Sequence, residues 1–167
     1  MEEVKDDIIH KIETGEILFN DVPPKPRIPY EIVKSTIEQF RPGVKVKCYP
    51  GNTVELNNVK YHYYAQYNSG NTDIPWYGIT KNVCEQLGKK ITGIILIYIK
   101  TLKGNIQGDI QSRYYLEVDK NIIKTFGKEE DNRFLLNFKF STTNQTFVIE
   151  KNGNDQLKMS KENKDKK

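Results

Sequence analysis

The run from Ile91 to Ile99, ITGIILIYI, constrains the fold more than any other stretch of the chain. It is almost uninterrupted isoleucine and leucine, yet it is far shorter than the roughly 20 residues of a membrane-spanning helix. A short apolar run of this kind is typical of a strand that is buried on both faces at the centre of a sheet. We therefore expect residues 91–99 to form a buried central strand, and we expect no membrane partner.

Patterns around this run alternate between helical and strand periodicity. Together they predict an α+β fold, with a mixed or antiparallel sheet of about six strands and two or three helices. Asn57-Asn58 predicts a hairpin turn, and Thr80 predicts a helix N-cap. The expected helices are 30–40, 80–87 and one turn at 121–126, and the other expected strands are 44–49, 54–56, 59–67, 113–118, 134–140 and 146–149.

Composition shifts divide the chain of 167 residues into four parts. Residues 1–21 hold two lysines and seven acids, and their apolar positions predict an acidic amphipathic helix. A Pro-rich linker follows, and then one domain of ordinary size. The final residues are polar and Lys-rich, which predicts disorder. The expected parts are 1–21 for the helix, 22–29 for the linker, 30–150 for the α+β domain and 151–167 for the tail.

The net charge of +4 is unevenly distributed. Residues 25–103 hold twelve basic and five acidic side chains, which gives this part a charge of +7. Such a bias fits a polyanion such as nucleic acid, although an ordinary solvated surface is the alternative. Cys48 and Cys84 are far apart in the sequence, so we expect free thiols in the reducing cytoplasm.

Motifs for catalysis are sparse. The two histidines are His10 and His62, and nothing in the sequence places a nucleophile beside either of them. Zinc-ligand spacing, a Gly-rich phosphate loop and a dinucleotide fingerprint do not occur. We therefore expect no metal and no cofactor, we assign no catalytic residue, and a binding protein is favoured over an enzyme.

A nuclease is the enzyme alternative. The order of helix, three strands, helix and buried strand resembles the core of PD-(D/E)xK nucleases, in which carboxylates hold the metal ions. The resemblance places one acid at Glu55, but the third strand has no (D/E)xK motif, and Gln66 is the only polar residue near the expected place. The stretch from Glu117 to Lys120 has acids and a lysine after the buried strand. The alternative is therefore an unusual or degenerate nuclease.

A predicted loop at 68–76 ends in the only tryptophan, Trp76. Large aromatic residues beside Gly, Pro and Asn in a loop favour a binding surface. In this hypothesis Trp76 and Tyr77 stack on or enclose a base, while Asn71 and Asp73 read its polar edges. The alternative for Trp76 is packing in the core, where a large aromatic residue anchors many small domains.

Basic residues near this loop are the expected phosphate contacts. Lys45 and Lys47 alternate with apolar residues on one strand, and Lys60 lies on another. Lys81 and Asn82 begin the helix after Thr80, and a helix N-terminus favours an anion. Six of the ten tyrosines lie between residues 49 and 77, where they either pack in strands or form a stacking platform.

The stretch from residue 70 to residue 100 resembles a known family. Gly70-Asn71, the loop Ile74 to Tyr77 and the apolar strand Gly93 to Tyr98 look like the N-terminal DNA-binding domain of McrBC-type modification-dependent restriction systems. That family recognises methylated DNA by flipping the modified base into a pocket. The resemblance implies a base-recognition module of a defence system that works with a partner carrying catalysis. A protein-interaction subunit, docked through its N-terminal helix and linker, is the remaining alternative.

Overall fold

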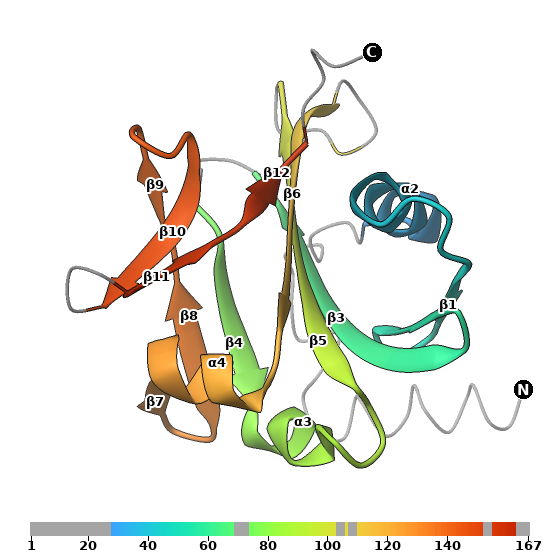
Figure 1. The fold of residues 1–167 in the computed structure, drawn as a ribbon, viewed down its shortest axis with the longest axis horizontal. Coiled ribbons are helices and arrows are strands. Elements are labelled where there is room, and N and C mark those ends of the chain that lie inside the picture. The colour runs from blue at the N-terminus through green and yellow to red at the C-terminus, as the bar shows by residue number, and fades with distance from the viewer. Residues whose placement is uncertain (1–27, 69–73, 103–105, 107–109, 152–154, 163–167) are drawn as a thin grey trace, which may run out of the picture.

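Figure 1 shows a large curved sheet with one helix on one side and two small sheets, which together we call the second layer, on the other side. The large sheet has six strands. The computed structural model describes residues 28–68, 74–102, 106, 110–151 and 155–162. Helix α2 (Tyr30–Phe40) lies against one face of the large sheet, and the small sheets lie on the other side. Two hydrophobic clusters fill the spaces between the layers. The expected α+β class is confirmed.

The large sheet is mixed, as expected. Its strands follow the order β1-β2-β3-β5-β6-β12, and β3 and β5 are parallel while the other neighbours are antiparallel. Asn57 and Asn58 take positive φ angles of 52° and 71° and close the predicted hairpin. The strands are β1 (Val46–Tyr49), β2 (Thr53–Leu56), β3 (Val59–Tyr67), β5 (Gly93–Thr101), β6 (Ile110–Val118) and β12 (Ser160–Lys161).

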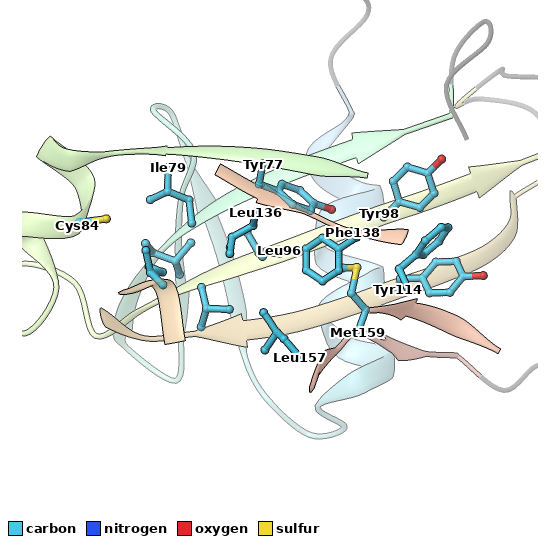
Figure 2. Packing of buried hydrophobic residues seen from close by; sticks show 14 of the residues in the cluster. Tyr77, Ile79, Cys84, Leu96, Tyr98, Tyr114, Leu136, Phe138, Leu157 and Met159 are labelled. Carbon is cyan, nitrogen blue, oxygen red and sulfur yellow. The ribbon is translucent and has the colours of Figure 1, made fainter. Parts of the chain in front are cut away.

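Strand β5 lies inside the large sheet, between β3 and β6. Ile94, Leu96 and Tyr98 point into the cluster beneath the small sheets, part of which Figure 2 shows. The alternate residues Ile95, Ile97 and Ile99 belong to the cluster that also contains apolar residues of α2. All six side chains are at most 1% exposed. The expectation of a central strand buried on both faces is confirmed, because each face of β5 meets its own core.

The second layer differs from the sequence prediction at two places. Residues 76–80, expected as the end of a loop and the start of a helix, form strand β4 (Trp76–Thr80), which pairs with β8. The single strand expected at 134–140 is divided at Phe138, so β8 and β9 enter different sheets. The two sheets have the orders β4-β8-β7 and β11-β10-β9. Their other strands are β7 (Lys128–Glu130), β8 (Arg133–Asn137), β9 (Lys139–Ser141), β10 (Thr146–Lys151) and β11 (Asp155–Lys158).

The two short helices, α3 (Lys81–Gln86) and α4 (Lys120–Phe126), begin at side-chain caps. The Thr80 hydroxyl accepts a hydrogen bond from the backbone N–H of Val83, as the sequence predicts, and Asp119 does the same for Ile122. Helix α4 ends at Gly127, as expected. Among the described residues, none of the helices has the length and apolar character needed to cross a bilayer.

The C-terminal residues correct the prediction of a disordered tail. Residues 155–162 contain β11 and β12, and the side chains of Leu157 and Met159 are buried in the core. Arg113 of β6 forms an ion pair with Glu162 at 3.8 Å and donates a hydrogen bond to Ser35 of α2 at 2.7 Å. The domain therefore extends at least to residue 162. The acidic helix expected at 1–21 and most of the linker at 22–29 lie outside the described residues.

Candidate nucleic-acid interface

Strand β4 points its residues alternately into the core and away from it. Trp76 is 44% exposed, whereas Tyr77 and Ile79 are completely buried. The Tyr77 hydroxyl donates a hydrogen bond to the carbonyl of Ile97 at 2.8 Å, and its ring meets Phe138 edge to face. Figure 2 shows this ring among the buried residues of the cluster. The prediction that Tyr77 stacks on a base is therefore wrong, because its ring is enclosed. The exposed indole of Trp76 is the part of that hypothesis that the geometry allows.

Arg133 lies over the exposed indole. Its guanidinium carbon is 5.8 Å from the centroid of the Trp76 ring, which is within the range of a cation–π interaction. Arg133 pairs in register with Thr80, so its side chain crosses Gly78 to reach the ring. A Cβ atom at Gly78 would lie 3.2 Å from the Arg133 Cδ and 3.5 Å from the indole. Because Gly78 has no Cβ atom, the side chains of Arg133 and Trp76 can meet above it.

Two further features define this surface, which we call the Trp76–Arg133 platform. Arg133 forms no ion pair among the described residues, although Glu130 lies directly opposite it in the pairing of β7 with β8. The side-chain amide of Gln66 both donates to the Trp76 carbonyl and accepts from the Trp76 backbone N–H. This double contact holds the start of β4 against the end of β3. The indole is therefore presented from a fixed backbone.

The expected phosphate contacts on the large sheet do come together. Lys47, Glu55 and Lys60 are direct neighbours across β1, β2 and β3. Lys45, Lys47 and Glu55, together with Asn58, line a pocket of about 180 Å³. Glu55 lies between the lysines and accepts a hydrogen bond from the Tyr49 hydroxyl at 3.3 Å. We call Lys45, Lys47 and Lys60 the lysine face.

The lysine face and the platform are separate areas. Lys60 is near the start of β3 and Gln66 is near its end, so six residues at about 3.3 Å each place them roughly 20 Å apart. They therefore do not form one pocket. The separation of the lysine face and the platform matches a ligand long enough to contact both areas.

No family model, curated protein or solved structure matches the chain. The resemblance of residues 70–100 to a restriction-system domain consequently stays a prediction. Its loop is described only from Ile74 onward, and Asn71 and Asp73 lie outside the described residues.

The predicted contacts at the start of α3 are less favourable. Lys81 forms an ion pair with Glu129 of β7, which compensates its charge. The Thr80 hydroxyl already occupies the N–H of Val83. Asn82 is exposed, and α3 has only six residues. Lys81 and Asn82 are therefore less suited to bind a phosphate than the lysine face is.

The nuclease alternative loses its simple order of elements, because strand β4 lies between the third strand and helix α3. Among the described residues, no group of three or more His, Cys, Asp or Glu side chains could hold a metal ion. Gln66, the polar residue near the expected place of the (D/E)xK motif, is hydrogen-bonded to the backbone of Trp76. Glu117 instead accepts hydrogen bonds from Arg41 and Tyr115. His62 packs edge to face on Tyr64, and burial lowers the pKa of its imidazole.

Arg133 is the residue that sequence reasoning missed. Its strand was expected to begin at Phe134, and its partner strand β4 was expected to be a loop. The alternating stretch from Phe134 to Phe140 carried a usable signal, because extending it back by one residue places Arg133 on the face opposite Phe134 and Leu136. The pairing with Trp76 could not be inferred, since it depends on two strands that are distant in sequence.

Proposed function

We propose that the chain is a nucleic-acid-binding module, with DNA favoured, that uses the Trp76–Arg133 platform and the lysine face. One observation carries the proposal: the sole tryptophan is 44% exposed beside an arginine that forms no ion pair among the described residues. Stacking of a base on an aromatic side chain is worth about 1–3 kcal/mol, and arginine both stacks on bases and binds phosphate. A buried indole would have removed this argument.

The distance between the two areas sets the expected length of the ligand. Consecutive phosphates on one strand are about 3.4 Å apart along a duplex, so roughly 20 Å corresponds to about six nucleotides. In the proposal Trp76 stacks on an accessible or flipped base, and Arg133 binds a phosphate or stacks beside it. The lysine face neutralises phosphates roughly six nucleotides away.

The wider role rests on the resemblance of residues 70–100. It supports a recognition module of a restriction or defence system, with modified DNA as the target and catalysis supplied by a partner chain. The reducing cytoplasm is the expected setting. The platform is compatible with this role because a flipped base needs an aromatic surface to replace the stacking it has lost.

Fluorescence anisotropy of labelled 12-nucleotide single strands and of duplexes with and without methylated cytosine, each at two salt concentrations, tests the proposal. We expect Trp76→Ala to weaken binding about 5- to 150-fold, which corresponds to 1–3 kcal/mol. Tyr30→Ala is the matched control, because Tyr30 is 43% exposed and lies on α2, beyond the other face of the large sheet. Replacing all three lysines of the lysine face by glutamine should lower the slope of log K against log salt by about 2 for a single strand.

Two results would contradict the proposal. One is the absence of binding to any of these nucleic acids at low salt, with the fluorescence of Trp76 unchanged. The other is binding that Trp76→Ala and Tyr30→Ala weaken equally. A preference for the methylated duplex would support the role in modification-dependent restriction, and equal binding of both duplexes would count against that role alone.

A further inference from the structure

Helices α3 and α4 lie next to one another at one end of the second layer (Figure 1), and they form a pocket of about 170 Å³. Helix α3 contributes Lys81, Cys84 and Glu85, and helix α4 contributes Lys120, Ile123 and Lys124. Both sets have the spacing i, i+3, i+4, which places each set on one face of its helix. Phe134 of β8 completes the lining.

The floor of this pocket is apolar. Ile123 is 1% exposed and Cys84 is 5% exposed, and both belong to the core cluster against which Phe134 packs. An apolar cavity of about 150 Å³ is large enough to bind benzene. The α3–α4 pocket therefore has the size and lining for one aromatic ring or a short acyl chain.

The rim of the pocket has a net positive charge, because Lys81, Lys120 and Lys124 outnumber its one acid, Glu85. Lys120 and Lys124 make no ion pair or hydrogen bond in the part of the chain that the structure describes, whereas Lys81 is paired with Glu129. Both unpaired lysines are close to the floor: burial raises the pKa of the Cys84 thiol, while Lys120 and Lys124 act in the opposite direction through their charge. Two ammonium groups beside an apolar floor favour an occupant that carries a negative charge.

We propose that the α3–α4 pocket binds a small amphipathic anion, with one aromatic ring on the apolar floor and a carboxylate between Lys120 and Lys124. Charge complementarity selects an anion over a neutral molecule of the same shape. The volume selects a single ring over a larger fused system. The site is distinct from the Trp76–Arg133 platform and does not depend on nucleic-acid binding.

Benzoate and its neutral analogue benzamide test this proposal in the full-length chain at constant ionic strength. In a Cys48→Ser background, the alkylation rate of the remaining thiol, Cys84, reports whether the pocket is occupied. We expect benzoate to slow alkylation at least threefold more than equimolar benzamide does. Replacing Lys120 and Lys124 by glutamine should abolish this difference. Replacing Lys89 and Lys90, which are exposed in the turn after α3 and do not line the pocket, should preserve it.

Amide chemical shifts of the uniformly ¹⁵N-labelled protein supply a second measurement if Cys84 reacts too slowly. Benzoate should move the resonances of α3 and α4 saturably and should do so in the Trp76→Ala variant as well. Equal effects of benzoate and benzamide would overturn the proposal. So would shifts that the double substitution in α4 leaves unchanged, or an absence of shifts at Cys84 and Ile123.

Discussion

Trp76 and Tyr77 are adjacent in sequence but face opposite sides of β4, so substitutions at the two positions should have very different effects on stability. Tyr77 is completely buried, and replacing a buried aromatic residue by alanine costs about 3–5 kcal/mol. Tyr77→Phe removes only the hydroxyl that donates to Ile97, for about 0.5–1.5 kcal/mol. Trp76 is only partly covered, and Trp76→Ala forfeits about 1.5–2 kcal/mol, from the cation–π contact with Arg133 and from the covered part of the indole.

These differences are large enough to measure by thermal unfolding. For a chain of this length, 1 kcal/mol shifts Tm by about 2–4 °C. Tyr77→Ala should therefore lower Tm by about 6–20 °C, and Trp76→Ala by about 3–8 °C. Far-UV circular dichroism is the suitable probe, because Trp76→Ala removes the only tryptophan from fluorescence.

A reversed order would refute the assignment of the two faces of β4. If Trp76→Ala lowered Tm as much as Tyr77→Ala, the indole would be part of the core and could not form a binding platform. If Tyr77→Phe were as stable as the wild type, the buried hydrogen bond to Ile97 would contribute nothing. Because both positions lie on one short strand, a general weakening of β4 could not produce the expected contrast.

Three further predictions concern other parts of the fold. Gly127→Ala should lower the free energy of unfolding by about 1–3 kcal/mol in urea titrations, because its Cβ would lie 2.5 Å from the carbonyl oxygen of Ile123; an unchanged midpoint would contradict this. Burial lowers the pKa of His62 below that in the unfolded chain, so the unfolded state binds more protons near pH 6. Stability should fall as the pH drops through about 6.5, and His62→Gln should reduce that slope. Deleting residues 155–167 should abolish cooperative unfolding by removing the buried side chains of Leu157 and Met159, and a cooperative thermal transition in the shortened chain would contradict this.

The elements that the sequence predicted correctly are determined by residues that are close to them in the sequence. Helix α2 has the predicted bounds, since its apolar spacing lies between a proline before its first residue and Pro42-Gly43 after its end. The β2–β3 hairpin follows from two asparagines that tolerate positive φ angles. The cap at Thr80 is a contact within one helical turn. Each of these features is decided by neighbours within a few residues.

The second layer could not be predicted in the same way. Residues 76–80 contain glycine and follow a proline, so their local pattern is that of a loop, but pairing with β8 makes them a strand. Residues 155–162 are largely polar, yet Leu157 and Met159 are enough to bury one side of the tail. Local propensity is a weak signal, and pairing with a distant strand overrides it.

The sequence alone determined the buried central strand and the helix and hairpin before it, because periodicity and turn residues act over short distances. It also predicted Trp76 and the lysine face as candidate binding residues. The tertiary structure decided which of these side chains reach solvent and which meet. It enclosed Tyr77, brought Arg133 over Trp76 across Gly78, and kept the lysine face roughly 20 Å away. Those outcomes depend on which distant strands pair, and a local sequence pattern does not determine that pairing.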